Sequence, residues 1–585
     1  MGTISDKLMR IINTKEDIRQ ALISKGYDVP TSIPFKEYAK MISDLPCRVD
    51  SFPDIEGIVA RYSALGLTNE QMAANPVWVD KTGNGHDIQL KNFSWKGMSG
   101  VGGYVQDFNY FRNNATVDKV RIDEQSSNSI KVTLLTSGMG HVIYIPKDVY
   151  QFNKSYFIKI SSEGYNEGDL FLSFYAPSTS TATTVKVPLN PNGITEIPAI
   201  KEDDFLAVYL FNAAGKVGSI TIEQLPLYPG ALVFDGVDDY DTCDNFPILT
   251  KEKGYTVVAL RQWITYNPNA ISAIATNASD QSFNGAFTFE NYNKGAEQTI
   301  SYGAIQISLQ YSKSPFSWQT TSKYNGFNIA NGNKDATNSL VLGRSYPQRN
   351  EFANFAIWEL VFLDHDATEE ELTKIKDYFV KTYPWLFPDQ AWTVTGKTNE
   401  DEDRATIANI TGNGNDLVLS NFGFIEGSGY NEEGEHAGYL VTDGVDDMIT
   451  SSAFQMGKDF TIVGDWKFID NKKSGTGLVK GSSFYIYNTM IGLDLYINSG
   501  SVKNSLDGIK SINAACSDGR AYDRNWNEIL ANTGNVVGSG GILEVSSSGG
   551  RFDRIAFKNL AIYPRILSKD DCIKAYNYLQ TLKSK

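Results

Sequence analysis

The chain has 585 residues, a formal net charge of −15, 50 glycines, 31 tyrosines, 31 phenylalanines and 21% charged residues. One hydrophobic core does not grow to this length, so the chain should divide into roughly three to five domains. The composition is typical of a folded, mainly β protein with many turns. The negative charge argues against nucleic acid as a partner, because such binding depends on Lys and Arg neutralising phosphates.

Residues 1–48 predict a helical hairpin. Apolar residues recur at helical spacing over residues 3–25, and Gly26 follows as a C-cap. A second apolar stripe begins near Pro34 and ends at Pro46. Two short helices bury too little surface to be stable alone, so we expect this segment to mediate attachment and homo-oligomerisation. Packing of the hairpin onto the neighbouring β domain is the alternative.

Targeting signals and cysteines bear on where the protein is made. The first ten residues are charged and contain no seven-residue apolar core, so no secretory signal is predicted. No stretch resembles a membrane span, and we expect no membrane insertion. The cysteines are spaced neither for a disulfide framework nor for a zinc cluster, so free thiols and synthesis in a reducing cytoplasm are predicted. They are Cys47, Cys243, Cys516 and Cys572.

A glycine- and asparagine-rich turn occurs at residues 82–87 and again at 411–416. Glycine at such positions permits the positive φ of a tight turn. The next shared motif follows Thr82 by 153 residues but follows Thr411 by 32, so the first copy carries about 121 extra residues. That length is enough for a small domain inserted in a surface loop.

The repeats therefore predict four parts. Strand-length apolar runs without helical periodicity, such as residues 185–189 and 205–210, make the insertion a small β-sandwich. The parts are an N-terminal segment over 1–48, a first β domain over 49–105 plus 226–388, an inserted β-sandwich over 106–225, and a second β domain over 389–585.

The pentapeptide Asp-Gly-Val-Asp-Asp occurs at residues 235–239 and 443–447. Three carboxylates in five residues are hard oxygen ligands of the kind that calcium takes. We favour a structural turn, in which Asp-Gly makes the bend and the later carboxylates accept hydrogen bonds from backbone amides. Calcium is the alternative, and no other cofactor is expected. Its candidate ligands are Asp235, Asp238, Asp239, Asp443, Asp446 and Asp447.

A strand followed by a capped helix also occurs twice, 200 residues apart. The strands are predicted at 355–364 and 555–564, and Thr368 and Ser568 follow as N-cap residues. An acidic residue three positions after each cap completes a capping-box pattern.

Catalytic patterns are sparse in this sequence. The four histidines are isolated from one another, which leaves little basis for a hydrolytic triad or a histidine-rich metal site. We predict that the chain is not an enzyme. Four tryptophans could stack on sugars, but core packing is the interpretation we favour. They are Trp263, Trp358, Trp466 and Trp526.

Residues 232–240, together with the strand and helix over 356–378, resemble the concanavalin A-like or laminin G-like jelly roll, and the second copy matches as well. The resemblance implies two jelly-roll sandwiches in a mainly β chain. That family includes lectins, carbohydrate-binding modules, adhesins and some glycosidases, so the fold does not choose a function. The Glu-x-Asp-x-x-Glu strand that one enzymatic branch carries does not occur here.

The N-terminal segment resembles helical segments of bacteriophage virion fibres, through residues 7–12, 26–29 and 35–42. This resemblance implies a tail or head fibre on the virion surface, made in the host cytoplasm, that contacts other virion proteins through its N-terminal helices. Its jelly rolls would bind host surface glycans. The alternatives are a purely structural head or tail component, and a glycan depolymerase with unplaced catalytic carboxylates.

Overall fold

The computed structural model describes Lys15 and most of residues 52–584. The residues between 52 and 584 that it leaves undescribed are 115–117, 181, 266–271, 278–287, 293–305, 312–322, 325–326, 330–338, 345–350, 433, 470–476, 481–483, 489–491, 498–505, 508–511, 531–540, 546 and 549–550. The chain divides into two compact units, Met1–Asp54 and Ile55–Lys585. The predicted helical hairpin falls outside the described residues, except for Lys15, which is helical.

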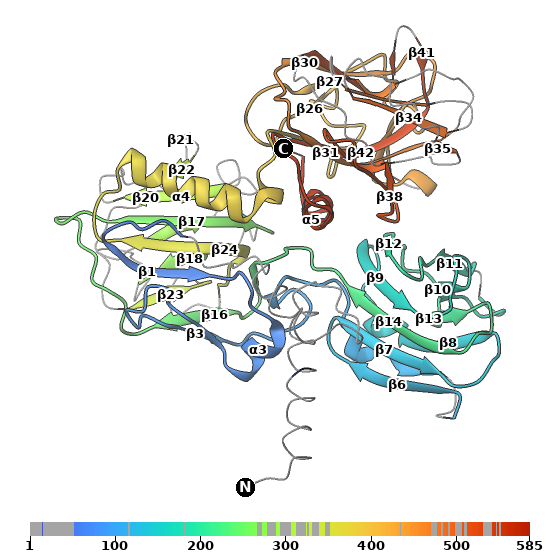
Figure 1. Ribbon diagram of the computed structural model, residues 1–585, viewed down its shortest axis with the longest axis horizontal. Coiled ribbons are helices and arrows are strands. Elements are labelled where there is room, and N and C mark those ends of the chain that lie inside the picture. Colours follow the sequence, from blue (N-terminus) through green and yellow to red (C-terminus); the bar gives the residue numbers. More distant parts are fainter. Residues whose placement is uncertain are drawn as a thin grey trace. The chain divides into compact units, whose positions relative to one another are not determined.

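The first jelly roll consists of two largely antiparallel sheets that enclose one core (Figure 1). The β17–β24 sheet contains β1 (Ile58–Ser63), β4 (Gly100–Val101), β15 (Leu232–Asp235), β17 (Thr256–Trp263), β20 (Gln306–Tyr311), β21 (Lys323–Tyr324), β22 (Phe327–Ile329) and β24 (Asn354–Leu363). The facing sheet contains β2 (Val77–Trp78), β3 (Ile88–Lys91), β16 (Tyr240–Cys243), β18 (Ser272–Thr276), β19 (Thr288–Tyr292) and β23 (Leu340–Leu342).

The inserted sandwich leaves and re-enters the first jelly roll through two adjacent backbone segments. Gly102 N donates to Ala231 O at 2.9 Å, and Tyr228 N donates to Gly102 O at 2.8 Å. Just beyond, the Gln224 side chain accepts from Val105 N and Gln106 N at 3.0 and 2.9 Å. The ends of the insertion are therefore held side by side, which is the geometry that lets a loop accept a whole domain.

Ten strands of the inserted sandwich pair only among themselves within the described residues. The β10–β13 sheet has the order β11 (Val185–Pro188), β10 (Leu170–Tyr175), β13 (Ala207–Asn212), β8 (Gly140–Pro146), β5 (Arg112–Asn113). The β9–β14 sheet has the order β12 (Ile194–Ile197), β9 (Tyr156–Ser162), β14 (Gly218–Gln224), β7 (Ser129–Leu134), β6 (Val120–Gln125). Apolar residues from both sheets share one core.

The second jelly roll repeats the first. Its β31–β42 sheet contains β25 (Gln390–Thr393), β28 (Gly429–Asn431), β29 (Tyr439–Val441), β31 (Thr461–Phe468), β36 (Ile512–Cys516), β37 (Ala521–Asp523), β38 (Glu528–Leu530) and β42 (Ile555–Tyr563). The facing sheet contains β26 (Thr406–Ile407), β27 (Leu417–Ser420), β30 (Met448–Phe454), β32 (Gly477–Lys480), β33 (Phe484–Asn488), β34 (Gly492–Ile497), β35 (Leu506–Asp507) and β39 (Gly541–Val545). β40 (Ser547–Ser548) and β41 (Arg551–Phe552) form a separate two-stranded sheet.

Helices are few in the described residues. They are α3 (Asn69–Ala74), α4 (Glu369–Thr382) and α5 (Lys569–Gln580), with short 3₁₀ turns η1 (Phe108–Tyr110), η2 (Lys147–Val149), η3 (Pro384–Leu386) and η4 (Gly434–His436). Thr368 caps α4 with a full capping box, and the Ser568 hydroxyl accepts from Asp571 N at the start of α5. None of these described helices has the length and apolar character needed to cross a lipid bilayer.

The mainly β class with two jelly rolls and an inserted β-sandwich is confirmed by these sheets. The residue boundaries assigned to the domains stay predictions. Cys243, Cys516 and Cys572 are free and buried, whereas Cys47 lies outside the described residues.

Candidate ligand-binding face

The repeated acidic pentapeptides form matching turns in the two jelly rolls. Asp235 Oδ1 accepts from Val237 N at 2.7 Å, and Asp239 Oδ2 accepts from Asp235 N at 2.9 Å. The second Asp239 oxygen accepts from the Ser99 hydroxyl at 2.9 Å. Asp239 is fully buried and Asp238 is exposed. These bonds hold the turn closed.

The second copy reproduces this geometry. Asp443 Oδ1 accepts from Val445 N at 2.7 Å, Asp447 Oδ2 accepts from Asp443 N at 2.8 Å, and Asp447 Oδ1 accepts from the Ser428 hydroxyl at 3.1 Å. Asp446, like Asp238, is exposed. The turn is thus a repeated structural unit of the fold.

Calcium binding at these turns stays a prediction. In each turn the three carboxylates offer oxygens within 4.8 Å of one another, which is close enough to share a cation. Burial, opposed by the Asp235 backbone hydrogen bond, raises the pKa of Asp239 to about 7, and burial likewise raises the pKa of Asp447 to about 6. Both buried carboxylates already have structural partners, so the turns need no ion to close.

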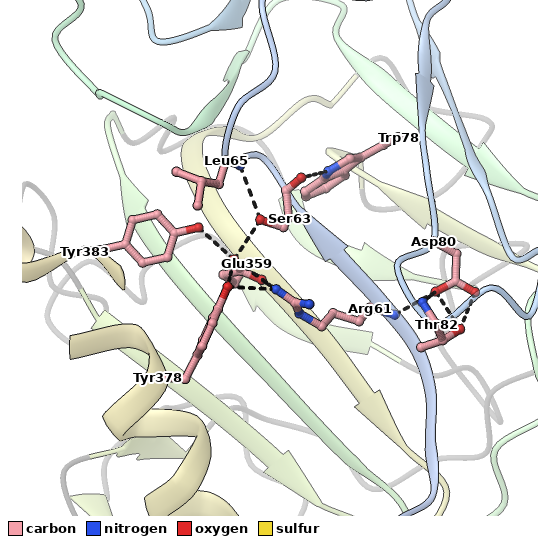
Figure 2. A network of polar contacts seen from close by, with 9 residues as sticks. All are labelled: Arg61, Ser63, Leu65, Trp78, Asp80, Thr82, Glu359, Tyr378 and Tyr383. Atoms are coloured by element: carbon pink, nitrogen blue, oxygen red, sulfur yellow. Dashed lines mark hydrogen bonds and ion pairs between the residues drawn. The ribbon is translucent and has the colours of Figure 1, made fainter. Parts of the chain in front are cut away.

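A second polar cluster lies between α4 and the face of the β17–β24 sheet that points away from the core of the first jelly roll. Figure 2 shows Arg61 and Ser63 of β1, Glu359 of β24, Tyr378 of α4 and Tyr383 with their polar atoms pointing toward one another. Glu359 accepts from Ser63 and Tyr383 at 2.7 Å each, and its Oε2 lies 3.2 Å from Arg61 Nη2. The Glu359 side chain is fully buried. This carboxylate cannot contact a substrate and is structural.

The tryptophans and histidines fall mostly in structural roles. Core packing of the tryptophans is confirmed, because the exposed fraction of each of the four is 3% or less. Among the histidines, His86 Nδ1 lies 2.6 Å from Asn245 O, and His365 Nε2 lies 3.3 Å from Glu371. His141 differs, because its ring contacts three aromatic rings, those of Tyr175, Tyr209 and Phe211.

His141 belongs to a surface of the inserted sandwich that we call the aromatic face. It is the side of the β10–β13 sheet that points away from the core. On β10, Leu170, Leu172 and Phe174 enter the core, so the alternating residues point outward. The outward residues are Arg112, His141, Tyr144, Phe171, Ser173, Tyr175, Lys186, Tyr209 and Phe211.

Contacts between rings hold the aromatic face together. The rings of His141 and Tyr209 stack with centroids 4.2 Å apart. Tyr144 and Tyr175 approach Tyr209 at 5.6 and 5.9 Å, and Phe211 meets His141 edge-on at 5.3 Å. Four of these five side chains are half-buried, whereas Tyr209 at the centre is 8% exposed. Rings fixed in this way form a preorganised apolar platform, since packing limits their rotation.

Backbone register places one outward residue from each strand in a row across the aromatic face. Arg112 pairs with Tyr144, Tyr144 with Tyr209, Tyr209 with Ser173, and Ser173 with Lys186. Adjacent strands lie about 4.8 Å apart, so the row spans roughly 19 Å. The Ser173 hydroxyl within this row is buried and makes no hydrogen bond to a described residue. Charged residues thus stand at both ends of an aromatic centre.

Electrostatics around the aromatic face are consistent with this packing. Burial lowers the pKa of His141, and the nearby Lys186 lowers it further. Lys186 Nζ lies 5.1 Å from the Phe211 ring centroid, so its ammonium group sits beside the platform. Burial, with a smaller contribution from Tyr144, raises the pKa of Tyr209. At neutral pH the imidazole of His141 is therefore uncharged.

Sequence reasoning did not find the aromatic face. Outward and inward residues of β10 are both largely apolar, so alternation alone does not say which side is solvated. The distribution of acidic residues between the two sheets is the feature of the sequence that could have identified the aromatic face. The five strands of the β10–β13 sheet contain no Asp or Glu, whereas the facing sheet carries Asp123, Glu124, Glu196 and Glu223.

No family model and no curated protein matches this chain. Among solved structures, Trypanosoma rangeli sialidase in complex with sialic acid matches at 9% identity and a TM-score of 0.25, over 84% of this chain and 98% of that one. The tandem CBM22-1–CBM22-2 domain of Paenibacillus barcinonensis Xyn10C matches at 10% identity and 0.15, over 46% and 99%. Truncated AlyQ, with CBM32 and alginate lyase domains, matches at 8% identity and 0.17, over 57% and 91%.

These matches contradict the prediction that the chain is not an enzyme, because the first of them are sialidases. We withdraw that prediction. At such TM-scores the similarity carries no argument about a reaction, a substrate or a catalytic residue.

Proposed function

We propose that this chain is an attachment protein that binds bacterial surface glycans, and that the aromatic face of the inserted sandwich contacts the sugar. One observation carries the proposal: a platform of packed rings on the outward side of a sheet, in which half-buried His141, Tyr144, Tyr175 and Phe211 surround the buried Tyr209. The C–H face of a sugar ring is apolar, so covering an aromatic ring with it removes apolar surface of both partners from water.

The polar groups beside the platform fit the same purpose. A saccharide site needs a few hydrogen-bonding groups to orient hydroxyls around an apolar contact. Tyr144, Tyr175 and Tyr209 each bring a phenolic hydroxyl to the rings, and Arg112 and Lys186 bring donors at the ends of the row. The face thus combines stacking area with several directional donors.

We place this attachment protein on a bacteriophage virion as a tail or head fibre. The support is the resemblance of the N-terminal segment to helical segments of phage fibres. In this proposal residues 1–48 contact other virion proteins and hold the chain as a homo-oligomer, assembled in the host cytoplasm and displayed on the virion surface. Several weak sites on one particle then raise overall binding by on the order of 10²–10⁴ without new contacts.

The test is binding of the full-length oligomer to host cells and to their extracted polysaccharides, with and without calcium. Tyr144→Ala combined with Phe211→Ala should reduce binding at least about tenfold, since each truncated ring removes stacking area. Tyr110→Ala is the matched control, because Tyr110 is 37% exposed on η1 and outside the aromatic face. Newly formed reducing ends are measured in the same incubations to separate binding from turnover.

Two outcomes would refute the proposal. Failure of the wild-type oligomer to bind any host polysaccharide would remove glycan attachment as its function. Equal loss of binding in the Tyr110→Ala control and the double variant would show that the aromatic face has no special part.

A further inference from the structure

We infer that the aromatic face selects carboxylate-bearing polysaccharides over neutral ones. This inference rests on the proposed function and concerns its substrate class. It begins from the charge distribution. The chain as a whole carries a net charge of −15, yet the five strands under the aromatic face contain no acidic residue and present Arg112 and Lys186 outward.

The position of Lys186 connects this charge to the stacking surface. Its Nζ lies 5.1 Å from the Phe211 ring centroid, and Phe211 contacts His141 at 5.3 Å. A sugar stacked on these rings would therefore have an ammonium group at its edge. Lys186 is exposed, and no ion pair to an acidic residue of the described chain is found for it. A ligand carboxylate can thus bind it without first displacing an internal partner.

Arg112 supplies a second cation at the other end of the row. It is exposed on the edge strand β5, beside Tyr144. Its guanidinium can hold a carboxylate through two parallel hydrogen bonds. The roughly 19 Å between the row ends suits an extended chain that crosses the strands and carries more than one negative charge.

Asp169 and the acidic residues of the facing sheet do not neutralise Arg112 and Lys186. Asp169, which directly precedes β10, is the acceptor of a salt bridge with Lys216, with 2.6 Å between Nζ and Oδ2. The acidic residues of the neighbouring sheet, such as Glu124 and Glu223, belong to strands on the opposite side of the sandwich core. The strands of the aromatic face therefore carry cationic side chains and no carboxylate on an acidic protein, which favours approach of an anionic ligand to this surface.

The experiment compares two probes with the same sugar backbone. Oligogalacturonate carries one carboxylate per ring, and its fully methyl-esterified form carries none. Calorimetric titration of the full-length chain should give about tenfold tighter binding of the charged probe at low salt, because two exposed ion pairs contribute at this scale. The preference should shrink toward 1 M salt, where the screening length falls to about 3 Å.

Charge-removing variants test which residues carry the preference. Lys186→Gln combined with Arg112→Gln should abolish the preference for the charged probe, and Lys186→Arg should retain it. Lys159→Gln is the matched control, because Lys159 is an exposed lysine on β9 of the facing sheet. It should leave the preference intact.

The outcomes separate this inference from the proposed function. Equal binding of both probes by the wild type would overturn the inference and leave glycan binding standing. A preference that survives the double variant would overturn the assignment to Lys186 and Arg112. Binding of neither probe, combined with no binding of host polysaccharides, would overturn both.

Discussion

Arg61 Nη2 lies 3.2 Å from Glu359 Oε2 between the β17–β24 sheet and α4, and the side chains are 5% and 0% exposed. The two equivalent positions of the second jelly roll are both uncharged. The strand registers show which positions correspond in the two domains. Arg61 lies opposite Val361 in the first jelly roll, and Ala391 lies opposite Ala561 in the second. Glu359 lies opposite Ser63 in the first, and Asn559 lies opposite Thr393 in the second. Ala391 and Asn559 therefore replace the ion pair. Asn559 Oδ1 accepts instead from Asp465 N at 3.0 Å. Both positions therefore differ between the two jelly rolls, which is expected if neither buried charge is tolerated without the other.

The first prediction concerns removal of one partner of this pair. Arg61→Ala leaves the buried Glu359 carboxyl group without its cation, beside Tyr378 and Tyr383, so the free energy of unfolding should fall by about 3–5 kcal/mol. Combining Arg61→Ala with Glu359→Asn copies the second jelly roll and should recover most of the loss. Calorimetric melting of the full chain measures both.

The matched control for that experiment is Lys374→Ala. Lys374 forms an exposed pair with Glu370 at 2.8 Å on α4, so its removal should leave the melting temperature nearly unchanged. A double variant that melts no higher than Arg61→Ala alone would contradict the account of a compensated pair.

The second prediction is a pH dependence from Asp239. Its pKa is about 7 in the folded protein against 3.8 as the ordinary value, mainly because of burial. Between these values the folded state binds the proton and the unfolded state does not, so stability should fall as the pH rises from about 4 to 7. Asp239→Asn should weaken this dependence, because an amide does not titrate. The turn should persist, because the amide oxygen can still accept from Asp235 N. The melting temperatures of the wild type and of Asp239→Asn across this pH range measure the contribution of Asp239. If the wild type gained stability relative to the variant as the pH rose toward 7, the prediction would be wrong.

The third prediction concerns calcium at the acidic turns. Because hydrogen bonds close both turns, addition of calcium or of a chelator should leave the melting temperature unchanged at neutral pH. Binding to the folded state at a hundred times the dissociation constant would instead add about 2.7 kcal/mol to stability. A calcium-dependent rise in melting temperature that Asp238→Asn and Asp446→Asn abolish would establish the metal site and exclude the purely structural interpretation.

The fourth prediction concerns the start of α4. Thr368→Ala removes the hydroxyl that accepts from Glu371 N and should cost about 1 kcal/mol of stability. Thr368→Ser keeps the acceptor and serves as the control. Equal melting temperatures for the Ala and Ser variants would show that the cap does not stabilise the domain.

Local features of the fold could be predicted from the sequence, because the interactions that form them span few residues. The Asp235 and Asp443 turns close through bonds over two to four positions, and the Thr368 capping box spans three. The repeated turn glycines behave in the same way: Gly83 and Gly412 have φ of 79° and 77°, which glycine adopts without strain.

Features that depend on distant partners could not be predicted. Arg61 and Glu359 are 298 positions apart in the chain, so no local pattern links them. The aromatic face likewise requires β8, β10 and β13 to pair, and only that pairing brings His141, Tyr209 and Ser173 together. Single-strand alternation identifies two faces but does not say which one packs on the core.

The central claim is that sugar binds on the outward side of the β10–β13 sheet. The most direct test is hydrogen exchange of the full-length chain with and without saturating host polysaccharide. The account predicts slower amide exchange in Gly140–Pro146, Leu170–Tyr175 and Ala207–Asn212, with no change in Ser129–Leu134 of the facing sheet. Protection confined to either jelly roll, with β8, β10 and β13 unchanged, would contradict it.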